Sequence, residues 1–342
     1  MRYLPPQRYC HSDPAAPPQL VVVIDTEEEF DWSGAFSRAQ TSVSAMRWIH
    51  RVQDIFDVYH ITPVYVIDYA IASQPEGYEP LQDSHAAGRA LIGAHLHPWV
   101  NPPYVEPVTG HNSFPGNLSP VLEAAKLQKL GDCIAEYFGT RPVLYKAGRY
   151  GVGPHTAAML EEQGYEVDLS LCPHMDYSAE GGPDFTGTPV TPYWFGQQRA
   201  LLALPLTVGY TGYFRQWGHP MHRLASRGVP GQLHAVGILA RLGLLNKVWL
   251  SPEGYSTAEH IQLTQTLYRA GVRVFSFAFH SPSVEPGHTP YVRSPQELED
   301  FLTRCRRFFD FFMGDFGGQS ATPLELKAQF AGSTDTFSQE GP

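Results

Sequence analysis

The sequence predicts an α/β fold, and within that class a barrel of parallel strands in preference to a doubly wound sheet. Short apolar runs alternate along the chain with longer segments of helical pattern. The runs mostly lack an apolar–polar alternation, as expected for parallel strands buried on both faces. Polar residues also follow the ends of several different runs, which is where a barrel gathers its chemistry. These observations together favour the barrel.

Each expected element is a segment between turn-forming residues. The expected strands are rich in Val, Ile, Leu and Phe and span residues 20–24, 64–69, 90–96, 143–146, 167–171, 201–206, 248–250 and 272–279. The expected helices span residues 41–59, 121–138, 155–164, 222–245, 257–270 and 295–313. Strand and helix alternate in this way in right-handed βαβ crossovers.

Length and composition fit one barrel-sized domain. The chain has 342 residues, 43% of them hydrophobic, which is enough to bury a large core. We expect an N-terminal extension over 1–18, the barrel domain over 19–315 and a C-terminal tail over 316–342. The end of the tail is rich in Ser, Thr, Gln and Gly, which predicts partial disorder.

Charge and apolar patterning limit the partners and the location. The net charge is −10, and no block of Lys or Arg offers a footprint for nucleic acid or an anionic membrane. The apolar runs are of strand length, so we expect no membrane insertion, and we expect a cytoplasmic protein. The cysteines lack CxxC spacing and are expected to be free thiols: Cys10, Cys133, Cys172 and Cys305. The oligomeric state stays open.

An acidic cluster follows the first strand in the segment VVVIDTEEEFDW. Asp25 and Glu27 share a face if the extended backbone continues, so one carboxylate can hold a metal while the other faces its water. Crowded carboxylates repel one another unless a cation or water separates them. The alternative is a solvated acidic turn. Whether Glu27 or Glu28 is the ligand stays open.

Two histidines end the third strand in IGAHLHPW. In a strand, His95 and His97 point to one face, a geometry suited to one Zn²⁺ or another divalent metal. Two imidazoles and one carboxylate leave a coordination position for water, as a catalytic site requires. The alternative is a pair of core or surface histidines.

Two further segments carry candidate site residues. His280 ends the strand in VFSFAFHSPS and could donate a proton to a leaving group. In YKAGRYG, Arg149 could pair with Asp25 and hold it ionised, with Lys146 as the alternative.

The remaining candidates are expected to contact substrate. Tyr150 follows Arg149, and its backbone N–H is a candidate donor to an oxyanion. Glu253 follows the seventh expected strand. The loop over 101–120 contains Asn112 and Ser113 and is long enough to form a substrate wall.

These segments, in this order, resemble the polysaccharide deacetylase family, which includes the NodB-homology proteins and carbohydrate esterase family 4. The resemblance covers about residues 20–313, and its most specific parts are VVVIDTEEE, IGAHLHP and FSFAFHSPS. It implies a distorted (β/α) barrel of seven to eight strands, a divalent metal, usually zinc, and hydrolysis of acetyl groups on sugars. Asp25 matches the catalytic base of the family.

The sequence also departs from the family pattern. The family places its metal-binding histidines four residues apart, whereas here they are two apart and Trp99 stands at the four-residue position. The arginine motif is altered, and we favour Arg149 over Lys146 for that role. A Trp-bearing motif after the fifth strand is not matched. Similar variants are associated with bacterial surface-polysaccharide synthesis.

The expected function is therefore removal of an acyl group from an amino sugar or a surface-polysaccharide precursor. Glu27, His95 and His97 would hold the metal, with Asp25 as base and His280 as acid. Two alternatives stay open, because one fold hosts many functions. One is an amide or ureide hydrolase of allantoinase type, and the other is an inactive carbohydrate-binding or assembly protein.

Overall fold

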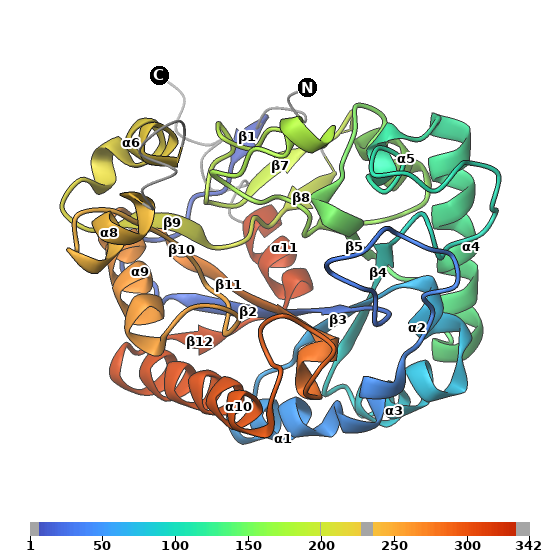
Figure 1. The fold of residues 1–342 in the computed structure, drawn as a ribbon, viewed down its shortest axis with the longest axis horizontal. Helices are drawn as coiled ribbons and strands as arrows, with labels where there is room; N and C mark the ends of the chain where they lie inside the picture. The colour runs from blue at the N-terminus through green and yellow to red at the C-terminus, as the bar shows by residue number, and fades with distance from the viewer. Residues whose placement is uncertain (1–6, 199, 227–234, 333–342) are drawn as a thin grey trace.

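Strands form the centre of the molecule in the computed structural model, which describes residues 7–198, 200–226 and 235–332 (Figure 1). The strands are β1 (Arg8–Tyr9), β2 (Gln19–Thr26), β3 (Val64–Ile67), β4 (Leu91–Leu96), β5 (Leu144–Ala147), β6 (Val167–Asp168), β7 (Tyr193–Phe195), β8 (Leu201–Ala203), β9 (Val208–Thr211), β10 (Asn246–Trp249), β11 (Val274–His280) and β12 (Gln319–Ser320). This is the mixed α/β architecture that the sequence predicts.

The main sheet has the strand order β1-β7-β8-β6-β5-β4-β3-β2-β11, with β12 also beside β2. Its strands are parallel except at one edge, where β7 pairs antiparallel with both β1 and β8. A separate antiparallel hairpin, β9–β10, lies between β8 and β11 in the chain. Its end touches β11 through a backbone bond from Ala278 N to Leu250 O at 3.1 Å and a bond from Ser276 N to Thr207 Oγ1 at 2.8 Å. Among the described residues, no ladder closes the sheet into a ring.

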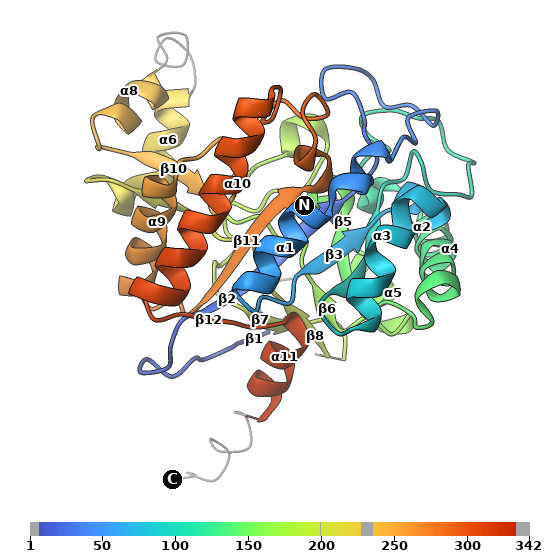
Figure 2. The same cartoon turned by 90° about the horizontal axis from the view of Figure 1, so that it is seen from below.

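Helices surround the sheet (Figures 1 and 2). The α-helices are α1 (His50–Val58), α2 (Tyr69–Ser73), α3 (Pro75–Ala86), α4 (Pro120–Phe138), α5 (Thr156–Glu162), α6 (Gly218–Ser226), α8 (Ala235–Arg241), α9 (Thr257–Arg269), α10 (Pro295–Phe309) and α11 (Pro323–Gly332). Short 3₁₀ or π turns lie at Ser44–Trp48, Pro115–Asn117, Gly148–Tyr150, Ser178–Glu180, Arg215–Trp217, Ser281–Val284 and Asp310–Asp315. None of the described helices is both long and apolar enough to cross a membrane.

Most strands of the main sheet are buried on both faces, which explains their continuous apolar sequence; the short strands β1 and β12 are the exceptions. In β2, Val22 and Ile24 belong to the larger apolar cluster, while Val21 and Val23 belong to a second one. Helix α11 contributes Leu326 to this second cluster. Because side chains alternate along a strand, Asp25 continues the face of Val21 and Val23 at the carboxyl end of β2. The inner face therefore changes from apolar packing to polar chemistry at that end.

Some elements differ from the sequence expectations. The run 248–250 belongs to the antiparallel hairpin and not to the parallel sheet. The expected helix 222–245 is described as α6 and α8, and residues 227–234 lie outside the described residues. In the expected tail, β12 pairs with β2, and α11 packs Phe330 into the core. Residues 333–342 of that tail also lie outside the described residues.

Candidate active site

Four polar side chains meet at the carboxyl ends of neighbouring strands. The register of β2 and β11 places Asp25 beside His280, and the register of β4 and β5 places His95 beside Lys146. Each continues the inner face of its strand, since Val21, Leu91, Leu144 and Val274 on the same face all contribute to the second apolar cluster. Parallel pairing thus brings segments far apart in the sequence to one edge.

Glu27, His95 and His97 form a buried group suited to a metal ion. The Glu27 Oε2 atom lies 3.4 Å from His95 Nε2 and 3.4 Å from His97 Nε2. One ligand atom of each residue lies within 4.8 Å of the other two. The structure brings together the three residues that the sequence assigned to the metal.

The other ring nitrogen of each histidine has its own partner. His95 Nδ1 lies 3.0 Å from the carbonyl oxygen of Lys146, and His97 Nδ1 lies 2.8 Å from Glu28 Oε2. Donation from Nδ1 to these oxygens leaves Nε2 as an acceptor, the arrangement that metal-binding histidines usually have. Burial lowers the pKa of both histidines, that of His97 to about 4, so both are neutral as ligation requires.

Glu28 supports this group from behind. Its Oε1 accepts a hydrogen bond from Trp99 Nε1 at 2.7 Å, and its backbone N–H donates to Asp68 Oδ2 at 3.3 Å. Burial raises the pKa of Glu28 to about 7, and burial together with the Glu28 charge raises that of Asp68. His97, Glu28 and Asp68 form a second possible metal group. Glu28 and Asp68 line neither of the two cavities that adjoin at Asp25 and His280, so the group with Glu27 is the better candidate.

The group of Glu27, His95 and His97 also fits a cation because one oxygen of its carboxylate has no partner among the described residues. Glu27 Oε1 is buried without a hydrogen-bond partner, and burial raises the pKa of this carboxyl group. An ionised carboxylate in such a place needs a cation or a proton. Two neutral imidazoles and one carboxylate are ligands that Zn²⁺ accepts. The donor set thus fits a divalent ion.

Asp25 pairs with Lys146, which corrects the expected pairing with Arg149. Lys146 Nζ lies 2.5 Å and 2.6 Å from the two carboxylate oxygens. Burial alone would raise the pKa of Asp25, but the positive charges of Lys146 and His280 lower it below its usual value. Asp25 is therefore a carboxylate at neutral pH.

Arg149 turns away from Asp25 because its backbone is left-handed, with φ of 53°. Its guanidinium donates to Ser113 Oγ at 2.6 Å, pairs with Glu180 and lies over the Phe114 ring. The preceding Gly148 is needed here, since a Cβ atom would lie 2.4 Å from His97 Cδ2. Arg149 still lines the pocket that contains Glu27, His95 and His97.

His280 is held by Glu253, for which the sequence suggested a substrate contact. His280 Nδ1 lies 2.7 Å from Glu253 Oε2, and Ser283 donates to the other carboxylate oxygen. His280 Nε2 faces Asp25 Oδ2 at 3.9 Å. Burial lowers the pKa of His280, but Glu253, Glu27 and Asp25 outweigh it and raise the value to about 10. His280 is thus an imidazolium at neutral pH, and Glu253 is its positioning partner.

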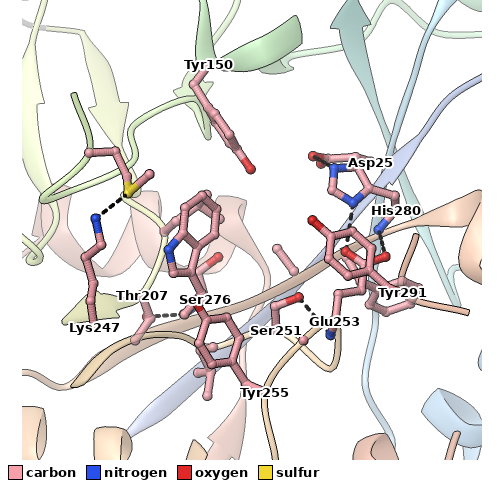
Figure 3. Close-up of a pocket in the computed structure, with 17 residues that line it drawn as sticks. Asp25, Tyr150, Thr207, Lys247, Ser251, Glu253, Tyr255, Ser276, His280 and Tyr291 are labelled. Atoms are coloured by element: carbon pink, nitrogen blue, oxygen red, sulfur yellow. Dashed lines mark hydrogen bonds and ion pairs between the residues drawn. The ribbon is translucent and has the colours of Figure 1, made fainter. Parts of the chain in front are cut away.

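Two pockets share the residues Asp25, Tyr150 and His280. The metal pocket, of about 260 Å³, is lined by Glu27, His95 and His97. The lysine pocket, of about 440 Å³, is defined by Lys247 and is drawn in Figure 3. The two pockets therefore adjoin at these three residues.

The predicted substrate residues are placed differently from one another. Tyr150 lines both pockets, and Figure 3 shows its side chain directed into the space beside Asp25. Asn112 and Ser113 line neither pocket; Asn112 donates to Pro107 O, while Ser113 binds Arg149. The loop over 101–120 contributes no lining residue to either pocket, so the expected substrate wall is not found there.

The pocket walls contain aromatic residues that sequence reasoning missed. Phe30, Trp32 and Phe36 line the metal pocket, and the Trp32 ring centroid lies 5.0 Å from that of His280. These residues lie in the FDWSGAF segment, directly after the acidic cluster. Three aromatic residues so close to a candidate metal ligand were the available signal.

Comparisons with known proteins agree with this geometry at the level of the fold. No protein family description matches the sequence, and no curated protein is significantly similar to it. A protein named as a polysaccharide deacetylase from Mycobacterium smegmatis is 14% identical, with 96% of both chains covered and a TM-score of 0.54. Another so named, from Pseudomonas aeruginosa PAO1, is 14% identical over 91% of this chain and 90% of that chain, with a TM-score of 0.50.

An allantoinase structure is about as similar as the second of these proteins. It is 14% identical, covers 91% of this chain and 89% of its own, and has a TM-score of 0.50. Structural similarity at this low identity shows a shared fold, but it does not show that two proteins share a substrate. The chain has the NodB-like fold of the polysaccharide deacetylases.

Proposed function

We propose that this protein is a metal-dependent hydrolase that removes an acyl group, such as acetyl, from an amino sugar or a surface-polysaccharide precursor. The observation that carries the proposal is the meeting of three groups at one edge of the sheet. They are the ligand set of Glu27, His95 and His97, the Asp25–Lys146 pair and the His280–Glu253 pair. The family fold is consistent with it.

A divalent ion on Glu27, His95 and His97 would polarise the acyl carbonyl and make a water more acidic. Asp25 takes a proton from the attacking water as general base. Lys146 keeps Asp25 ionised and oriented for that transfer, since both carboxylate oxygens accept from its ammonium group. Lys146 thus fills the role that the sequence gave to Arg149.

His280 supplies the proton for the leaving group. Its Nε2 is free of the bond that Nδ1 makes to Glu253, so it can donate to the amine nitrogen as the C–N bond breaks. The products are the carboxylic acid and the free amine. Burial raises the pKa of Tyr150, so its hydroxyl stays protonated and can donate to a substrate oxygen. Arg149 is the further candidate for a substrate contact, from the metal pocket.

A ureide or other amide hydrolase is the second candidate, favoured by the likeness to the allantoinase fold. The same residues would act on its C–N bond. An inactive binding protein is less well supported, since it would need neither the Asp25–Lys146 pair nor the His280–Glu253 pair. We further propose that the catalytic domain, expected over residues 19–315, also includes β12 and α11, since both pack on it. A cytoplasmic location is proposed on the sequence grounds alone.

The decisive experiment measures metal content and acid release on the same preparation. We expect about one equivalent of a divalent ion and release of acetate from N-acetylglucosamine oligomers or nucleotide sugars. Chelation should abolish this hydrolysis, and added Zn²⁺ should restore it. Full activity of a preparation shown by elemental analysis to be metal-free would exclude the mechanism. Activity on cyclic ureides alone would identify the second candidate.

A further inference from the structure

The lysine pocket extends the site away from the metal ligands. It includes Asp25, Tyr150 and His280 but none of Glu27, His95 and His97. Figure 3 shows Lys247 at the opposite end of the drawn pocket from Asp25 and His280. At about 440 Å³, the pocket has room for a sugar-sized group. A molecule cleaved beside Asp25 can thus place its remaining part next to Lys247.

Charges in this pocket are paired except at Lys247. Asp25 is neutralised by Lys146, and Glu253 is neutralised by His280. Among the described residues, the Lys247 ammonium donates only to the Met175 sulfur, at 3.2 Å, and this sulfur is a weak acceptor. No carboxylate of a described residue forms an ion pair with it, and residues 227–234 contain no Asp or Glu.

The backbone explains why this ammonium faces the pocket. Lys247 and Trp249 alternate with Val248 along β10, so they share one face and both line the pocket, while Val248 packs in the core. Burial lowers the pKa of Lys247, as expected of an ammonium group without a counter-charge.

The sequence around Lys247 also lacks acidic residues. From residue 185 to residue 252 the chain has no Asp or Glu, although its net charge is −10. Both strands of the hairpin come from this segment. Lys247 therefore has no acidic residue within five positions of it along the chain.

We infer that the substrate carries an anionic oxygen group, a phosphate or a carboxylate, that pairs with Lys247 in the lysine pocket. The aromatic rings of Trp249, Tyr255 and Tyr291 line the same space and offer flat apolar surface to a sugar ring. An oxyanion would complete the hydrogen bonds of the ammonium, which the Met175 sulfur cannot. The substrate class is thus an acylated amino sugar with an acidic substituent, an assignment that rests on the proposed function.

Binding measurements test this without relying on turnover. Zinc-loaded Asp25→Asn protein is titrated calorimetrically with N-acetylglucosamine, N-acetylglucosamine 6-phosphate and N-acetylmuramic acid. We expect at least one anionic probe to bind about 10- to 100-fold more tightly than the neutral sugar. The phosphate and carboxylate probes show which oxyanion is preferred. Equal affinity of all three probes overturns the inference.

Variants locate the preference. In the same background, Lys247→Met should bring the anionic probes to within about twofold of the neutral one, and Lys247→Arg should keep part of the preference. The control Lys129→Met removes an exposed lysine of α4 and should change nothing. A preference that survives Lys247→Met would come from the metal, from Arg149 or from Lys146, which this background leaves without its partner, and would overturn the inference.

Two further results decide the inference if a variant fails to fold or if the proposed function is wrong. If Lys247→Met does not fold, the salt dependence of probe binding to the Asp25→Asn protein decides, because an ion pair weakens as salt rises. A salt-independent preference would contradict the ion pair. Hydrolysis of neutral N-acetyl sugars with no anion preference would refute this inference and leave the proposed function standing. A preference for the anionic probes without hydrolysis of any probe by the unmodified protein would refute the proposed function and leave the anion site at Lys247 standing.

Discussion

Buried charges at the carboxyl ends of the strands are neutralised in two different ways. In the proton-transfer region, Asp25 is paired with Lys146 and Glu253 with His280, both through side chains of this chain. In the metal region, Glu27, Glu28 and Asp68 are buried with no Lys or Arg partner among the described residues, and their pKa values are raised mainly by burial.

The difference shows which region is complete by itself. The proton-transfer pairs have their counter-charges and can form during folding without a ligand. The metal region has an excess of buried carboxylates, and an uncompensated buried charge is costly. The stability of the metal region should therefore depend on metal and pH. The stability of the proton-transfer region should depend on whether both partners of each pair are present.

The largest effect should come from the histidines of the metal region. His95→Ala and His97→Ala should each remove most of the bound metal and abolish hydrolysis, because each supplies one ligand nitrogen. Elemental analysis and acetate release measure this, and added Zn²⁺ should no longer raise the Tm. His155→Ala is the control, since that side chain is exposed and makes no capping bond. Retention of metal by either variant would break the assignment.

The next effect separates base from ligand across the two regions. Asp25→Asn should keep the metal and lower kcat by about 10²- to 10⁴-fold, whereas Glu27→Gln should lose metal affinity. Asp25→Asn also leaves Lys146 buried without its partner, which should cost about 3–5 kcal/mol of stability. The double variant Asp25→Asn/Lys146→Met should regain stability but not turnover. The opposite pattern of metal loss would exchange the two roles.

His280 should show a smaller effect that depends on the leaving group. His280→Ala should bind metal normally and lower kcat more than it raises KM, by about 10²-fold on an N-acetyl sugar. The loss should shrink on an activated aryl acetate, whose leaving group needs no proton. Steady-state kinetics on both substrates measure this. Equal losses would mean that His280 positions the substrate.

The smallest effect is a change in pH dependence. Glu253 raises the pKa of His280, so Glu253→Gln should lower that pKa from about 10. Because the protonated imidazole is the acid, activity is lost as pH rises through this pKa. The alkaline limb of kcat/KM should therefore move to lower pH, while Glu299→Gln, at an exposed position of α10, should leave it in place. An unmoved limb would assign that limb to another group.

The sequence by itself determined the central strands and the ends where chemistry gathers. The apolar runs that became β2, β4 and β11 are recognisable because burial on both faces requires continuous Val, Ile, Leu and Phe. Asp25, His95 and His280 then follow on the strand period, which is a local property. The short strands β1, β7, β9 and β12 were not predicted, because pairing of two to four residues depends on distant partners.

Only the tertiary structure decided which candidate fills each role. Lys146 and Arg149 are three residues apart, and composition favours neither; the β4–β5 register directs Lys146 inward, while a left-handed backbone turns Arg149 away. Glu27 and Glu28 are adjacent, and only contacts across strands show that one faces both His Nε2 atoms and the other supports His97 from behind. Neighbours in sequence differ here because the fold, and not the local chain, sets what each side chain meets.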